Sequence, residues 1–440
     1  MIKSIITLLF QFLPFEISNN QKYVAKNAGS TILINGISLL LRLTFFVTCF
    51  VVCTDLVFSK FIFYIIAIET LSSIGNFGVP QYVYQKLPIL KKKNQKKELR
   101  TLIKFATRVS FWGNLIMALL ATIFYLLLAR YHISVYAYIL FILSIPANGI
   151  LRLRDETLKS LGHTISGYIG YDILGILVSC IGVLLIFIIK GTTDFNTVVT
   201  IYSIGLVVSF ICSVLLYNLK VRLAFAEYDW NLFNVRWIAG TFAYWNLYVI
   251  DSLLRIALYF LLVHHHGLIE GGMYVLLLEM TLMLTLAPKI INNTLLPFFY
   301  SSLQSNKNRL QVILKKSSQF NLLISCTIFT ILVGAFELLK LQTGIAPSPW
   351  LLIFLLLLSS LFIENYFSPS DLLLLLNKNG KALLRSRIFC LAIQLILGWI
   401  LIHKMGALGA AITFFVSKLI LNATQYFLLR KNTSLKTGLI

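Results

Sequence analysis

Charged residues are scarce in this chain of 440 residues. Only 12% of the residues are charged, whereas 58% are hydrophobic, and a soluble domain carries about a quarter charged residues. The hydrophobic residues form runs long enough to cross the roughly 30 Å hydrocarbon core of a bilayer as helices. Only short loops remain between these runs, which excludes a sizeable soluble domain. The composition therefore predicts an all-α integral membrane protein.

Acidic residues are much rarer than basic ones. The chain has 16 Asp and Glu against 38 Lys and Arg, a formal net charge of +22. The basic residues gather in short segments between hydrophobic runs, as the positive-inside rule predicts for cytoplasmic loops. This distribution argues against nucleic acid as a partner. The loop Lys86–Lys104 is the most basic segment, and we expect it to meet anionic lipid headgroups.

The sequence also lacks the spacing of a metal site. None of its six cysteines forms a CxxC pair, and they are interpreted as small packing residues. The three adjacent histidines His264–His266 fall in a predicted outer turn. They indicate a solvated, pH-responsive turn, with a zinc site as the lesser alternative. We expect neither a metal nor a cofactor.

The hydrophobic runs predict twelve spanning helices. They lie at approximately 30–52, 58–84, 105–128, 135–153, 165–189, 197–217, 237–263, 272–299, 319–339, 349–376, 388–403 and 407–429. The stretch Met1–Phe15 is too short to span and no good cleavage site follows it, so residues 1–29 are predicted to form a cytoplasmic or interfacial segment.

The distribution of Lys and Arg predicts the orientation. If the N-terminus is cytoplasmic, 29 of the 38 basic residues lie in inner segments and five in outer turns. Because Lys and Arg in short loops set topology, we expect both termini to face the cytoplasm.

The two halves of the chain share landmarks at nearly one offset. The matching pairs are Arg42 with Arg255, Glu69 with Glu279, and the turn glycines Gly162 with Gly380. They predict two six-helix lobes, at 30–218 and 219–430, followed by a cytoplasmic tail at 431–440. Transporters often place their substrate site between such repeats. The alternative is coincidence among a few rare charges.

Three patches carry a likeness to a known family. They are Lys26–Ser30 (KNAGS), Ile74–Pro80 (IGNFGVP) before the basic loop, and the Gly380 turn followed by Gly406–Ala411 (GALGAA). With the twelve-helix plan, the chain resembles the O-antigen flippases of the multidrug, oligosaccharidyl-lipid and polysaccharide exporter superfamily. The resemblance implies a MATE-like, V-shaped pair of lobes around a central cavity.

The same resemblance implies a function and partners. The cargo would be undecaprenyl pyrophosphate carrying an oligosaccharide repeat unit, moved from the cytoplasmic to the periplasmic leaflet of a bacterial inner membrane. Coupling to protons or another cation gradient is compatible with it. The resemblance is also compatible with membrane lipids, a polysaccharide polymerase and chain-length proteins as partners.

Charges inside spanning helices are expensive and indicate function. A pyrophosphate headgroup needs a cationic path, and guanidinium groups bind phosphate through two hydrogen bonds. Arg42, Arg255 and Lys418 are therefore the predicted substrate-binding cations. The alternatives are structural ion pairs, Arg255 with Asp251 four residues earlier on the same face, or movement of the Lys418 head toward the cytoplasm.

Carboxylates in the spanning helices are the predicted ion-coupling residues. They are Glu69, Glu279, Asp251 and Asp172, because a carboxylate in a low dielectric can take up and release a proton. The alternative is structural pairing of Glu69 with Arg42 and of Glu279 with Arg255.

Aromatic residues with an amide follow on the helix predicted at 237–263. Tyr244, Trp245 and Asn246 could contact sugar rings, although an interfacial belt with interhelical packing is the commoner meaning of such a cluster.

Three other functions compete with a flippase. A membrane polymerase or glycosyltransferase would need a larger outer loop than this chain has, so we expect no enzyme. A multidrug exporter of the same fold would need a more acidic cavity. A membrane acyltransferase would need an embedded histidine, whereas His132, His163 and His403 lie at predicted helix ends.

Overall fold

The computed structural model describes residues 19–127, 134–191, 193–221, 233–285, 307–343, 347–377 and 379–433. The predicted segment before residue 19, the second half of the helix predicted at 272–299 and the tail beyond 433 lie outside these ranges. Within them, eleven helices are long and apolar enough to cross a membrane. The predicted all-α membrane fold is confirmed.

The chain divides into two compact units, which are described separately. The N-unit is Ile37–Leu253, and the C-unit is Leu254–Ile440 together with the residues up to Gly36. Both divisions fall inside a helix, one in α2 (Asn19–Val52) and one in α10 (Arg236–His266). The sequence predicts the boundary between the lobes at residue 218, which lies near the end of α9 (Phe195–Lys220).

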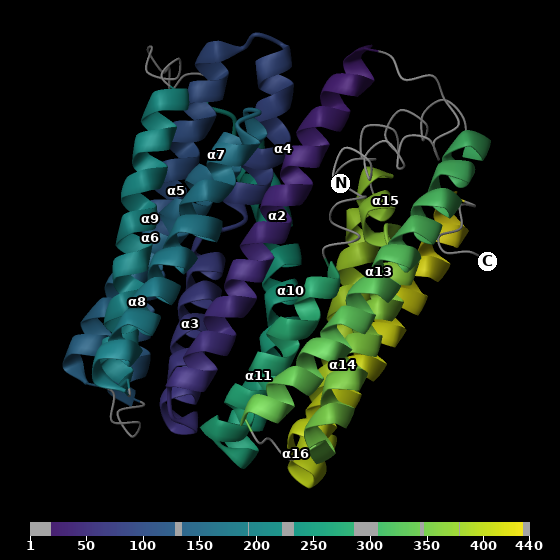
Figure 1. Ribbon diagram of the computed structural model, residues 1–440. Coiled ribbons are helices and arrows are strands. Elements are labelled where there is room, and N and C mark those ends of the chain that lie inside the picture. Colours follow the sequence, from purple (N-terminus) through teal and green to yellow (C-terminus); the bar gives the residue numbers. More distant parts are fainter. Residues whose placement is uncertain are drawn as a thin grey trace. The chain divides into compact units, whose positions relative to one another are not determined.

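The N-unit is a bundle of membrane-spanning helices (Figure 1). Besides its parts of α2 and α10, it comprises α3 (Asp55–Gly75), α4 (Val79–Lys92), α5 (Lys96–Leu127), α6 (Val135–Ser160), α7 (Thr164–Tyr168), the π-helix η2 (Ile169–Gly175), α8 (Ile176–Lys190) and α9 (Phe195–Lys220). A buried cluster around Leu87, Leu102, Leu158 and Trp237 joins α4, α5, α6 and α10.

The prediction of one continuous helix at 58–84 is wrong, because the structure has two helices there, α3 and α4. Phe77 and Gly78 both have positive φ, at 48° and 69°, and Pro80 lies in the first turn of α4. A Cβ atom at Gly78 would lie 2.4 Å from the backbone of Trp245. The chain therefore turns where the backbone of α10 comes close, and only glycine fits there.

Other predicted helices of the N-unit also differ from the structure. α6 runs to Ser160 instead of ending near 153, so its basic residues belong to a helix and not to a loop. The helix predicted at 165–189 contains η2, and Asp172 lies in this π-helical stretch. π-Helical turns often occur at functional sites.

The C-unit contains the second part of α10 and the remaining helices. They are α11 (Leu268–Thr281), the 3₁₀-helix η5 (Leu282–Thr285), α13 (Lys307–Thr343), α14 (Pro347–Phe367), α15 (Ser370–Leu376) and α16 (Gly380–Thr433). The helix predicted at 349–376 is thus divided into α14 and α15.

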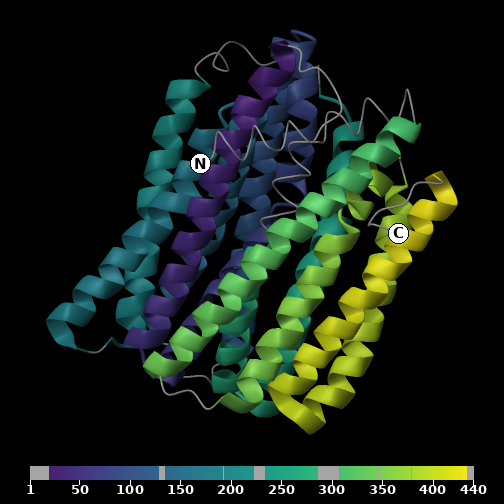
Figure 2. The same cartoon turned by 45° about the vertical axis from the view of Figure 1, so that its right-hand side comes forward.

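α16 is a hairpin of two helices. Gly406 has φ 57° and ψ −135°, and the Cys390 thiol lies 3.0 Å from the carbonyl oxygen of Ser417 on the other half. Figure 2 shows the two yellow halves side by side. The predicted helices at 388–403 and 407–429 are both present, and they form the two halves of the last of the eleven candidate spans in the described residues.

Candidate functional site

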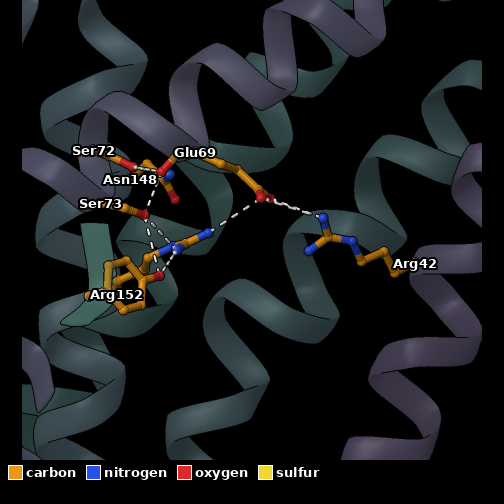
Figure 3. A network of polar contacts seen from close by, with 7 residues as sticks. Arg42, Glu69, Ser72, Ser73, Asn148 and Arg152 are labelled. Carbon is orange, nitrogen blue, oxygen red and sulfur yellow. Dashed lines mark hydrogen bonds and ion pairs between the residues drawn. The ribbon is translucent and has the colours of Figure 1, made fainter. Parts of the chain in front are cut away.

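Three charged side chains meet inside the N-unit. The carboxylate of Glu69 on α3 lies 3.3 Å from the Arg42 guanidinium on α2 and 3.6 Å from the Arg152 guanidinium on α6. Figure 3 shows Glu69 between the two arginines. The three side chains are 22–28% exposed. The two guanidinium groups thus share one carboxylate. The three side chains, called the triad below, carry a net charge of +1.

Neutral polar groups orient Arg152. Its Nη1 donates to the Ser73 hydroxyl at 3.0 Å and to the Tyr248 hydroxyl at 3.1 Å. Ser73 is one helical turn after Glu69 and donates to its carbonyl oxygen at 2.5 Å. One helical turn before Arg152 on α6, the Asn148 amide donates to the Ser72 hydroxyl at 2.7 Å. The α3–α6 contact is therefore polar at the point where the charges meet.

A narrow pocket adjoins the triad. Arg42 and Glu69 line one side of it, and Gly175, Ser179 and Ser209 of η2, α8 and α9 line another. Its volume of about 30 Å³ is enough for a water molecule but not for a sugar. The fully buried Ser209 hydroxyl has no hydrogen-bond partner among the described residues. The pocket therefore has room for a water molecule beside the carboxylate.

Arg152 was missed as a site residue because the predicted helix ended at 153 and its charge was counted with an inner loop. One signal could have found it. Asn148 and Arg152 are four residues apart, so they lie on one helix face, and both polar side chains contact α3.

The predicted site residues of the second half are not assembled in the same way. Arg255 is exposed on α10. Asp251 and Glu279 are half-buried, and the alternative that Arg255 pairs with one of them for structural reasons stays a prediction. A role of Arg255 in substrate binding stays a prediction.

The C-unit has a different internal ion pair. Lys418 on α16 lies 2.7 Å from the Glu364 carboxylate on α14, and its ammonium group lies 5.7 Å from the centre of the Phe414 ring. Lys418, predicted as a binding cation, is thus already paired. This pair joins α14 to α16 within the C-unit.

Asp172 also meets a cation in the structure. Its carboxylate lies 3.6 Å from the Lys159 ammonium group, which also contacts Glu156 at 3.1 Å and the face of the Tyr168 ring at 3.9 Å. Lys159 lies at the end of α6 that extends beyond the predicted helix. The contact holds η2 against α6.

The aromatic cluster of α10 packs against the α3–α4 turn. Trp245 donates its indole N–H to the Ile74 carbonyl at 2.9 Å, and its ring lies 5.6 Å from that of Phe77. Tyr244 donates to the Gln85 side chain, and Asn246 is half-buried. These contacts fit the packing alternative, because the polar groups of both aromatic residues already have partners.

Metal ligands do not cluster in the described ranges, where no group of three His, Cys, Asp or Glu side chains could hold a metal ion.

No protein-family model and no curated protein sequence matches the chain. Solved structures do match in fold. A multidrug-resistance MATE family transporter of the MOP superfamily, in its outward-facing conformation, gives a TM-score of 0.66 at 12% identity over 96% of this chain and 97% of that one. MATE in the straight conformation gives 0.66 at 14% identity, over 96% and 98%.

A third similar structure is a MOP superfamily transporter from Pyrococcus furiosus, whose reversed pocket polarity suggests a different function. Its TM-score is 0.65 at 12% identity, over 96% of this chain and 97% of that one. The chain therefore has the fold of MATE transporters. At this level of identity the similarity concerns the fold, and it does not single out the O-antigen flippases.

Proposed function

We propose that the protein is a membrane transporter that flips an amphiphile with an anionic headgroup, namely a lipid-linked oligosaccharide carried on undecaprenyl pyrophosphate. The single observation that carries this proposal is the Arg42–Glu69–Arg152 triad, in which two guanidinium groups share one carboxylate. The excess cation suits a phosphate. The MATE-type fold supports transport as the activity, and the proposed location is a bacterial inner membrane with both termini in the cytoplasm.

The triad offers a way to bind and release phosphate. A phosphate oxygen can replace the Glu69 carboxylate as the partner of a guanidinium group, because both anions accept the same paired hydrogen bonds. The headgroup would enter by replacing Glu69 as the partner of a guanidinium group, so no guanidinium group would be left without an anion. When the headgroup leaves, Glu69 restores the resting pair.

The pocket beside Glu69 supports coupling to a cation. When phosphate takes an arginine, the carboxylate needs a proton or a small cation, and the pocket next to it has room for water or such an ion. Glu69 is therefore the proposed coupling residue in the N-unit. Glu279, Asp251 and Asp172 stay secondary candidates.

A multidrug exporter is the second candidate, because a multidrug-resistance MATE transporter is among the similar structures. An exporter of cationic drugs would be expected to present excess carboxylate to its cargo. In the N-unit the excess charge has the opposite sign, which favours an anionic headgroup.

The test compares arginine variants in a strain that depends on this protein for its surface glycan. Arg42→Gln and Arg152→Gln are each expected to reduce transfer of undecaprenyl-linked repeat units about 10- to 100-fold. Each loses a charge-assisted hydrogen bond to phosphate, worth about 1.5–3 kcal/mol. The matched control is Arg108→Gln, at an exposed arginine on α5, with the amount of membrane-inserted protein measured for every variant.

Accumulation of repeat units on the cytoplasmic leaflet, with normal transfer by the control, would support a flippase. Normal surface glycan after deletion of the protein, combined with drug sensitivity, would refute it in favour of the exporter.

A further inference from the structure

The turn inside α16 is fastened by a side chain from another helix. Glu270, in the first turn of α11, accepts a hydrogen bond from the Ala407 N–H at 2.6 Å. Ala407 begins the second half of α16, so the carboxylate caps the N-terminus of that helix. Gly406 is required beside it, because a Cβ there would lie 2.2 Å from the Glu270 carboxylate oxygen.

His266, on α10, contacts both the Glu270 carboxylate and the first half of α16. It is the last residue of α10, and its Nδ1 lies 3.4 Å from the second carboxylate oxygen of Glu270. Its Nε2 lies 2.7 Å from the carbonyl oxygen of Ile402, on the first half of α16. α10, α11 and both halves of α16 thus meet at this one pair of side chains.

The partners of the imidazole determine how many protons the pair carries. A carbonyl oxygen only accepts, so Nε2 must be an N–H donor. Nδ1 lies at ion-pair distance from the carboxylate, so a second hydrogen, on Nδ1, would place a positive ring beside a negative group, whereas a neutral imidazole has a single N–H. The carboxylate therefore favours a pair that holds one proton more than a neutral histidine beside a carboxylate.

We infer that His266 and Glu270 form a proton-binding site that holds the α16 turn closed. The position favours a cation, because the C-terminal end of α10 carries the negative end of the helix dipole. The groups that oppose further positive charge are His264 and His265 on α10 and His403 and Lys404 on α16. The rings of His265 and His403 are 5.3 Å apart.

The site lies at the end of the C-unit opposite residue 433. In the predicted orientation this is the outer end, so the proton would come from outside the cell. When the proton is lost, either Nε2 or Nδ1 has no hydrogen to donate to the oxygen atom that it faces. The contacts that hold the turn are then weaker. The inference concerns proton binding by the C-unit and does not depend on the cargo.

The first experiment measures thermal unfolding of the purified full chain in detergent between pH 5 and 8.5, the range in which imidazoles titrate. Wild type is expected to lose a few degrees of unfolding temperature as the pH rises. His266→Gln and Glu270→Gln are expected to remove that loss, and His266→Arg to keep the low-pH stability throughout. The matched control, His264→Gln, changes an exposed ring stacked on Trp399 and should keep the wild-type dependence.

The second experiment distinguishes proton binding from a structural effect of the substitutions. In wild-type protein with ¹⁵N-labelled histidine, the ring signals that disappear in His266→Gln are assigned to His266. The His266 ring should have two N–H groups at a pH at which the ring of His264 has one. A His266 ring that titrates together with His264, or an unchanged pH dependence in His266→Gln and Glu270→Gln, would overturn the inference. Neither measurement involves transport, so its failure leaves the proposed function intact.

Discussion

Removing the Glu69 carboxylate is the sharpest perturbation of the N-unit. Glu69→Gln preserves the shape of the side chain and leaves Arg42 and Arg152 facing each other without an anion. The triad then changes from a net charge of +1 to +2. By contrast, Arg42→Gln leaves the remaining arginine paired with Glu69 and the site neutral. The two substitutions should therefore differ in severity, although each removes one charge.

The size of the effect follows from the distances. At 3.3 and 3.6 Å, an effective dielectric constant of about 20 gives roughly 5 kcal/mol of attraction for each guanidinium, much of it offset by lost hydration. Breaking a buried pair costs about 3–5 kcal/mol, and an exposed pair contributes about 0–1 kcal/mol. With about a quarter of each side chain exposed, we expect Glu69→Gln to cost about 2–3 kcal/mol and Arg42→Gln about 1 kcal/mol.

The assay is unfolding of the purified protein in mixed micelles with increasing sodium dodecyl sulfate, followed by circular dichroism. The double variant Arg42→Gln/Glu69→Gln should be about 1–2 kcal/mol more stable than the sum of the single losses predicts. Asp55→Asn, at an exposed carboxylate in the first turn of α3, is the control and should cost less than about 1 kcal/mol. Equal losses for Glu69→Gln and Arg42→Gln, or additive losses in the double variant, would refute the shared-carboxylate reasoning.

Three further predictions concern other parts of the chain. Lys418→Met should cost about 1–2 kcal/mol in the same assay, because it leaves Glu364 unpaired, and adding Glu364→Gln should recover part of the loss. Gly78→Ala should cost about 2–4 kcal/mol, because its φ of 69° and the close backbone of α10 both oppose a side chain. Gly334→Ala, in open space on α13, should instead be neutral or stabilising. Burial and two nearby lysine ammonium groups lower the pKa of His163, so the unfolded chain binds that proton more readily. His163 should therefore contribute a loss of stability as the pH drops below about 6.5, opposite in sign to the contribution of His266 and Glu270, and His163→Gln should remove this contribution in a thermal unfolding series.

The predicted internal repeat shows that spacings along the chain do not determine which charged residues form ion pairs. The offsets of Arg42 with Arg255 and of Glu69 with Glu279 predicted two repeated lobes, with an ion pair in each lobe as the structural alternative. The structure has the pair of Arg42 with Glu69, and in the C-unit it has pairs such as Lys418 with Glu364 and Arg387 with Asp371. Which charges meet depends on how each helix is rotated about its own axis, and a spacing along the chain does not contain that rotation.

Hydropathy alone determined the class of the protein and the approximate positions of the spans in its described residues. Burying an apolar helix in hydrocarbon is a local transfer of about 20 residues, so each run of sequence specifies its own span whatever its neighbours do. The breaks in those spans at Gly78, in η2 and at Gly406 depend on contacts with other helices.

Only the tertiary structure decided which polar groups meet. Arg152 joins Glu69 because α6 continues past its apolar stretch and packs on α3, and Glu270 caps α16 because α11 lies beside that turn. Such contacts join residues far apart in the chain, and their geometry is fixed by the packing of whole helices. No short stretch of sequence carries that information.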